Sequence, residues 1–249
     1  MEPQDTYLKG RGAQINTPNP YHNLEYDQEP VDWSLAEQEE EAPKLRTEFI
    51  PVHPKTMLNK VKSPDIPADF SLNPYQGCEH GCVYCYARNT HPYWGYSAGL
   101  EFEQKILVKQ DAAKLLEKKL KSKRWKATPL MLSGNTDCYQ PAERLLKITR
   151  SILEVLWKYR HPVGIITKNS LILRDLDILK KMNEHNLVHV SISITTLDEQ
   201  LRMLLEPRTA NIKSRLKVVE ELSAAGIPCL LYTSPSPRDA TLPRMPSSA

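Results

Sequence analysis

The sequence lacks any long hydrophobic run. No stretch of its 249 residues approaches the roughly 20 consecutive apolar residues that a membrane-spanning helix needs. The first residues, MEPQDTYLKGRG, contain no apolar segment that could act as a signal peptide. We therefore expect a cytoplasmic protein without a membrane partner.

A strong excess of charge of one sign is also missing. The 33 lysines and arginines nearly balance the 30 aspartates and glutamates, and the formal net charge is +3. Overall charge therefore does not indicate nucleic acid or an anionic membrane as a partner. The hydrophobic content of 40% is sufficient for a folded core in a chain of this length.

Cysteine is scarce, but it is clustered. Three of the five cysteines, Cys78, Cys82 and Cys85, fall within the segment GCEHGCVYCYAR at residues 77–88. Because cytoplasmic thiols stay reduced, such a cluster favours a metal or catalytic site over a disulfide framework. The flanking glycines, Gly77 and Gly81, allow the backbone to fold tightly around the site.

The number of cysteines in the loop leaves two kinds of metal site open. Structural zinc normally takes four protein ligands, so the fourth would have to come from His80, His91 or Cys138. Alternatively, three thiolates bind an iron–sulfur cluster and leave one metal coordination position free. A free position allows a cluster to bind and activate a small molecule.

Composition divides the chain into three parts. Residues 1–65 are polar and Pro-rich, which predicts a partly disordered lead-in, and residues 66–230 carry the periodic apolar pattern of a folded core. Residues 231–249 form a Ser/Pro-rich tail that cannot complete a sheet and resembles translated sequencing-adapter read-through. We therefore expect native sequence to end near Cys229, and a truncated core of poor solubility.

Strand-like and helix-like segments alternate within the core. Apolar runs predict strands at 130–133, 163–167, 188–194 and 227–231, with a further short strand at 69–77. Amphipathic patterns predict helices at 111–123, 142–160, 173–185 and 215–226. This alternation predicts an α/β fold with a parallel sheet, either a barrel or a doubly wound sheet.

Small and polar side chains follow the predicted strands. In parallel α/β folds the chemistry gathers at the carboxyl ends of the strands. Residues 133–138, 167–170 and 191–198 should therefore meet at one rim, together with the cysteine loop.

The loop resembles the signature of the radical S-adenosylmethionine (SAM) superfamily. The resemblance rests on C-x3-C-x2-C with an aromatic residue before the last cysteine. The segments SGNTDCYQPAE, ITKNSLILRDLDIL, SITTLDEQLRMLLEPR and ELSAAGIP are similar to those of bacterial superfamily proteins related to spore photoproduct lyase. The resemblance covers roughly residues 66–230 and implies a partial (β/α) barrel, incomplete at its C-terminus.

The resemblance also implies a chemistry and a set of residues. The three cysteines would hold a 4Fe-4S cluster that cleaves SAM reductively, and the resulting radical would abstract a hydrogen atom from a substrate. A reductant such as flavodoxin or ferredoxin is implied, and a nucleic-acid lesion is one candidate substrate. The implied SAM contacts are Tyr84, Ser133, Gly134, Asn135, Asp137, Lys168, Ser193 and Arg208.

Two features have competing interpretations. Cys138 lies at the predicted rim, where it could donate a hydrogen atom to a product radical, or it is a plain buried thiol. The lysine-rich segment 114–126 could contact nucleic acid, but its leucines at helical spacing favour the solvated face of an outer helix.

Overall fold

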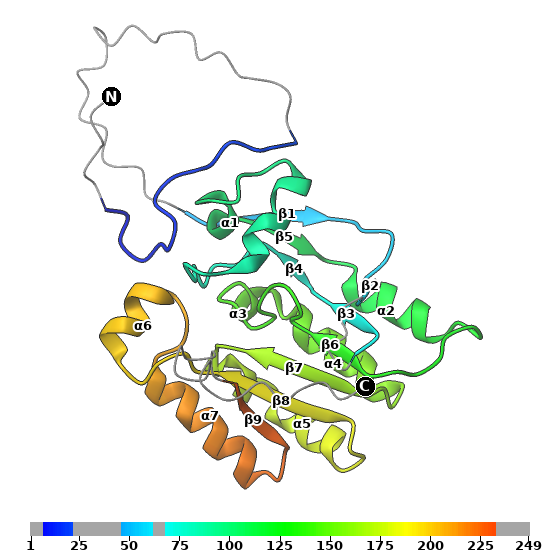
Figure 1. Ribbon diagram of the computed structural model, residues 1–249. Helices are drawn as coiled ribbons and strands as arrows, with labels where there is room; N and C mark the ends of the chain where they lie inside the picture. The colour runs from blue at the N-terminus through cyan, green and yellow to red at the C-terminus, as the bar shows by residue number, and fades with distance from the viewer. Residues whose placement is uncertain (1–6, 22–45, 62–67, 233–249) are drawn as a thin grey trace, which may run out of the picture.

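A six-stranded sheet organises the protein. The computed structural model describes residues 7–21, 46–61 and 68–232. The strand order of this sheet is β2-β3-β6-β7-β8-β9, and all neighbours are parallel except β2 and β3 (Figure 1). Its strands are β2 (Leu58–Lys60), β3 (Phe70–Leu72), β6 (Leu130–Leu132), β7 (Val163–Thr167), β8 (Val188–Ser193) and β9 (Cys229–Tyr232).

Helices connect the parallel strands in sequence order. The crossovers contain α4 (Ile148–Lys158), α5 (Leu176–Asn183) and α7 (Ile212–Ala224). Right-handed crossovers between strands that follow one another in a sheet place their helices on the same face. The predicted fold class is confirmed as an α/β partial barrel, and its sheet does not close within the described residues.

A second, three-stranded sheet lies beside the first. Its order is β1-β5-β4, formed by β1 (Glu48–Val52), β5 (Lys105–Lys109) and β4 (Tyr75–Gln76). The single strand predicted at 69–77 is in fact two strands, because the chain passes from the large sheet in β3 to the small sheet in β4. The cysteine loop therefore begins directly after β4, at Gly77.

Part of the predicted lead-in is folded. Strands β1 and β2 lie before residue 66, and residues 7–21 are also described. The sequence did not predict these two strands, because each is short and lies in Pro-rich sequence, and each pairs with a strand later in the chain. Of the predicted tail, residues 231 and 232 complete β9, and the remainder lies outside the described residues.

The helix predicted at 142–160 is interrupted. It forms α3 (Glu143–Leu146) and α4, separated by Lys147 with a left-handed φ of 51°. The Glu143 carboxylate accepts a 3.0 Å hydrogen bond from the Thr149 backbone N–H at the start of α4. This bond satisfies one of the free amides at the helix start, so the break is capped from within the chain.

The other predicted helices differ in their bounds, and α5 and α7 replace the helices predicted at 173–185 and 215–226. The helix predicted at 111–123 is shorter, forming α2 (Ala112–Leu120), and α6 (Glu199–Leu205) was not predicted. The Asp198 side chain accepts hydrogen bonds from the Gln200 and Leu201 amides and begins α6 as its N-cap.

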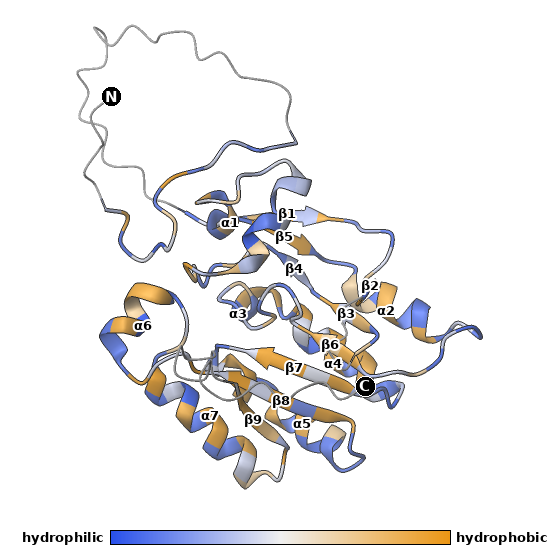
Figure 2. Cartoon of the chain, viewed as in Figure 1, coloured by the Kyte–Doolittle hydropathy of each residue, from blue (hydrophilic) through white to orange (hydrophobic). Residues whose placement is uncertain are grey.

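Apolar side chains fill the space between the large sheet and its helices. Strand β7 of this sheet is predominantly hydrophobic (Figure 2). On α4, Ile148, Ile152 and Leu156 recur at every fourth position and are buried, which is the pattern of a helix packed by one face. Within the described residues, we find no helix with the length and apolar character required to cross a membrane.

Candidate functional site

The cysteine loop begins at a glycine that no other residue could easily replace. Gly77 has a left-handed φ of 82°, and a Cβ there would lie 2.8 Å from the carbonyl oxygen of Lys105. Gly81 has a φ of 66°. The Cys78 amide donates a 2.9 Å hydrogen bond to Phe102 O, which anchors the loop to the segment before β5.

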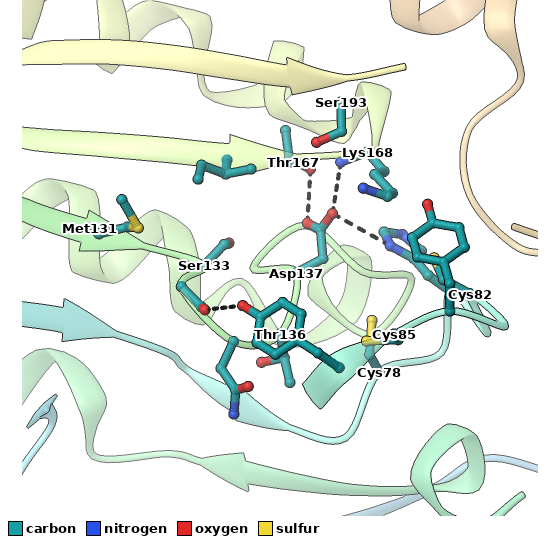
Figure 3. Close-up of a pocket in the computed structure, with 16 residues that line it drawn as sticks. Cys78, Cys82, Cys85, Met131, Ser133, Thr136, Asp137, Thr167, Lys168 and Ser193 are labelled. Carbon is teal, nitrogen blue, oxygen red and sulfur yellow. Dashed lines mark hydrogen bonds and ion pairs between the residues drawn. The ribbon is translucent and has the colours of Figure 1, made fainter. Parts of the chain in front are cut away.

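A cavity of about 520 Å³ lies between this loop and the carboxyl ends of β6, β7 and β8 (Figure 3). This volume falls in the range typical of small-molecule sites. Every predicted site residue except Cys138 and Arg208 lines this cavity. The lining consists of Cys78, His80, Cys82, Tyr84, Cys85, Tyr86, Met131, Ser133, Gly134, Asn135, Thr136, Asp137, Ile166, Thr167, Lys168 and Ser193.

The segment after β6 adopts an unusual backbone conformation. Ser133 has a left-handed φ of 74°, and its Oγ accepts a 2.8 Å hydrogen bond from the Cys138 amide. Asn135 N donates to Asn73 Oδ1 at 2.9 Å, which ties this segment to the turn between β3 and β4. Non-glycine residues in this region of backbone space concentrate at binding sites, where the surrounding contacts hold them.

Asp137 fastens the β6 loop to the end of β7. Its Oδ1 accepts a 2.8 Å hydrogen bond from Thr167 Oγ1, and its Oδ2 accepts a 2.7 Å bond from the Lys168 amide (Figure 3). His80 Nδ1 lies 3.4 Å from Oδ2, and burial lowers the pKa of this imidazole although Asp137 opposes the shift. Asp137 therefore shapes the cavity chiefly by joining three segments.

Cys138 lies behind the cavity lining. Its side chain is fully buried in the main hydrophobic core, and burial raises the pKa of its thiol well above the usual value. These surroundings are those of a packed thiol. A hydrogen-donating role for Cys138 stays a prediction that the geometry does not favour.

Arg208 also lies outside the cavity lining. Its Nη2 is 3.4 Å from Glu79 Oε1, and its amide donates a 3.1 Å hydrogen bond to His80 O. These contacts make it a support of the cysteine loop. Lys168, in contrast, lines the cavity, with its Nζ 4.0 Å from Glu206 Oε1.

The three loop thiols face one cavity from one short segment, and this donor set fits an iron–sulfur cluster. Burial raises the pKa of Cys78 well above its usual value and that of Cys82 to about 12, with smaller contributions from the neighbouring thiols and Asp137. A bound metal offsets this cost because thiolates are the ligating form. Within residues 7–21, 46–61 and 68–232, no three His, Cys, Asp or Glu side chains are arranged to hold a metal ion as they stand.

Several lining residues were not assigned a role from the sequence. Met131 and Ile166 lie on strands whose alternate side chains turn toward the cavity, so the two-residue strand period could have identified them. Tyr86 donates a hydrogen bond to Gly134 O across the cavity mouth. That contact joins segments 48 residues apart, and no local pattern indicates it.

The lysine-rich segment 114–126 lies outside this cavity lining. Helix α2 packs against α4, and Lys121, directly after α2, is 3.4 Å from Glu117 Oε1 in a surface ion pair. Glu117 also receives a 2.8 Å contact from Lys158. These contacts agree with the solvated face of an outer helix.

Comparison with known proteins assigns the family. The family model for the radical SAM superfamily matches residues 72–235. Uncharacterised proteins of Mycobacterium tuberculosis and Methanocaldococcus jannaschii are 32% and 30% identical, over 73% and 76% of this chain. The matched regions cover 54% and 68% of those proteins, so the chain spans about half the length of the mycobacterial relative.

Solved structures show the same fold. Spore photoproduct lyase complexed with dinucleoside spore photoproduct superposes with a TM-score of 0.56 at 18% identity, over 75% of this chain and 51% of that one. A mutant of that lyase with bound AdoMet and dinucleoside spore photoproduct gives a TM-score of 0.55 at 18% identity, over 76% and 51%. With the family match across most of the described core, the chain belongs to the radical SAM superfamily.

Proposed function

We propose that the chain is the core of a radical SAM enzyme that holds a 4Fe-4S cluster on Cys78, Cys82 and Cys85. When bound, this cluster supplies the low-potential electron that cleaves SAM reductively, and the radical so formed abstracts a hydrogen atom from a substrate. The observation that carries the proposal is the opening of all three loop thiols into a single cavity at the carboxyl edge of the sheet.

The other residues of the cavity would bind and orient SAM. Lys168 brings a positive charge suited to a carboxylate, and Ser193 brings a hydroxyl at the end of β8. Tyr84 brings an aromatic ring beside the cysteines. The Ser133–Asp137 segment supplies backbone and side-chain polar groups on the facing side.

The proposal implies two further partners. Reductive cleavage requires a one-electron donor, for which flavodoxin or ferredoxin is the natural class. The substrate to test first is a dinucleotide lesion, because the fold neighbour was solved with dinucleoside spore photoproduct. Salt-dependent binding of DNA or RNA would support a nucleic-acid substrate.

The test is metal analysis and electron paramagnetic resonance of protein purified without oxygen and reconstituted with iron and sulfide. Spectra of the reduced protein are recorded with and without SAM. The wild-type chain should hold about four irons, as the cluster type requires, and its signal should change when SAM is added. Cys82→Ser should lose the iron, whereas the matched control Cys229→Ser, in β9 outside the loop, should keep it.

The alternative is a structural zinc protein without catalysis. Stoichiometric zinc in a folded sample, with no spectral response to SAM, would overturn the enzyme proposal. Equal iron retention by both cysteine variants would overturn the ligand assignment.

A further inference from the structure

A segment near the N-terminus lies against the cysteine loop. We call residues 11–17 the strap. Thr17 N donates a 2.7 Å hydrogen bond to Ser97 Oγ, and Leu100 N donates a 3.1 Å bond to Ile15 O. The strap is therefore fixed to residues 97–100, which follow the cysteine loop in the chain.

The strap and the loop meet backbone to backbone. A Cβ placed on Gly12 would lie only 1.8 Å from the carbonyl oxygen of Gly81, so no larger residue fits at position 12 without displacing one of the two segments. Gly81 lies between the first two loop cysteines and is itself in the left-handed region. The strap therefore meets the cysteine motif at a residue between its first two cysteines.

A buried carboxylate joins the strap to the loop. Glu103 is fully buried, and its two oxygens accept hydrogen bonds from Gly12 N at 3.1 Å and Ala13 N at 2.8 Å. Arg11 Nη1 donates a 2.9 Å bond to the backbone oxygen of the same residue. Arg88 Nη2, 2.7 Å from Glu103 Oε1, is the third donor to this carboxylate.

Arg88 links Glu103 to a backbone carbonyl of the cysteine loop. Its Nη2 and Nε donate to Cys82 O at 3.0 and 3.3 Å, and its Nη1 donates to Gly99 O at 3.1 Å. The order of contacts is therefore strap amides, Glu103, Arg88 and the Cys82 carbonyl. Loss of the strap would leave a buried charged carboxylate with one of its three donors, and Glu103 would no longer be fixed by the strap amides in the position where it meets Arg88.

The strap also covers a second face of the site. A cavity of about 330 Å³ lies between the strap and residues 83–99, and Cys85 lines both this cavity and the main one. The strap therefore controls how Cys85 is reached from the side that does not hold the Ser133–Asp137 segment.

We infer that the strap is a positioning element of the cysteine site, which holds Arg88 on the Cys82 carbonyl through Glu103 and shields the second face of Cys85. The inference deepens the proposed function, because a loop held in this way keeps its three thiols in one arrangement. It concerns residues 11–13, 88 and 103, none of which carries a thiol.

The test compares Gly12→Ala with Gly10→Asn in the full chain. Gly10 has a φ of 79°, and a Cβ added there would have no atom within 4 Å. Asparagine tolerates this conformation, so the control changes the residue directly before the strap without a clash. In metal-free protein, the alkylation rate of Cys85 is measured by mass spectrometry, with Cys229 as an internal reference. Gly12→Ala should raise the relative rate several-fold, whereas Gly10→Asn should leave it unchanged.

A second measurement needs no variant. Hydrogen exchange in the wild-type chain should show strong protection at the Gly12 and Ala13 amides, and fast exchange there would overturn the inference even if Gly12→Ala fails to fold. Equal Cys85 alkylation in folded wild type and Gly12→Ala would also overturn it.

The cluster readout separates this inference from the proposed function. After reconstitution, Gly12→Ala should lose iron in air several-fold faster than wild type and Gly10→Asn. If the wild-type chain takes up no iron, the proposed function fails, while the alkylation and exchange data still decide the role of the strap.

Discussion

Tyr84 of the cysteine loop donates a hydrogen bond to the buried carboxylate of Glu206. Glu206 Oε2 is 2.6 Å from Nη2 of Arg215, which is also buried and donates a 3.0 Å bond through Nη1 to Ser193 O. The Val83 amide donates a 3.0 Å bond to Leu205 O alongside. The segment after α6 therefore ties the loop to the carboxyl end of β8.

Replacing Glu206 by glutamine should destabilise the fold strongly. The change leaves the Arg215 guanidinium buried without its counter-charge, which costs roughly 3–5 kcal/mol of unfolding free energy. The matched control is Glu154→Gln, which breaks the exposed pair with Arg150 and should cost at most about 1 kcal/mol. Urea unfolding of the metal-free chains measures both, and similar losses in the two variants would contradict the prediction.

The glycine at the start of the cysteine loop offers a second test. Gly77→Ala and Gly226→Ala each place a side chain at a left-handed φ, which costs about 1–2 kcal/mol. At Gly77 the new Cβ also meets two backbone oxygens at 2.8 and 3.0 Å, whereas at Gly226 the nearest atom is 3.9 Å away. Chemical denaturation should show a clearly larger loss for Gly77→Ala, and only this variant should lose iron on reconstitution.

His91 should make stability depend on pH. Burial lowers the pKa of this imidazole from 6.5 to about 4, although the backbone of Glu101 opposes the shift. Between these values the unfolded chain binds a proton that the folded chain does not, so stability falls as pH falls from about 6.5 to about 4. The loss from this residue is about 3 kcal/mol across the window.

The variant that isolates this effect is His91→Phe. An aromatic ring at this position keeps the contacts with Phe102 and Tyr96, whose ring centroids lie 5.4 and 5.5 Å away, but it cannot titrate. Unfolding free energies measured at several pH values should decline less steeply in acid for the variant than for wild type. Parallel profiles would show that His91 is not the titrating group.

Much of this architecture follows from sequence periodicity. The apolar runs around Leu132, Ile165 and Val190 predicted three neighbouring parallel strands, and polar residues after each run predicted the cavity edge. These features are local and repeat at the strand period. The resemblance carried by the cysteine spacing then identified the superfamily.

The features that sequence alone missed depend on contacts between distant residues. Strand β1 pairs with β5 more than 50 residues later, and the strap meets Glu103 about 90 residues later. Both segments lie in polar, Pro-rich sequence, so neither shows a periodic apolar pattern. Their contacts are instead made by backbone groups and one buried carboxylate, which no local pattern indicates. Cys138 shows the converse limit, since its place after a strand predicted the cavity edge but its side chain turns into the core.

Lys168 gives the most direct test of the proposed SAM site. Its side chain lines the cavity, and its ammonium group lies 4.0 Å from Glu206 Oε1, which already accepts a hydrogen bond from Tyr84, so the ammonium group is available to a carboxylate. Hydrogen bonds that involve a charged group contribute about 1.5–3 kcal/mol, so Lys168→Met should weaken SAM binding by about tenfold or more. Lys180→Met, which removes an exposed lysine on α5, is the matched control and should bind SAM as wild type does. Equilibrium dialysis with reconstituted protein measures both affinities, and an unchanged affinity in Lys168→Met with an intact iron content would remove Lys168 from the proposed SAM contacts.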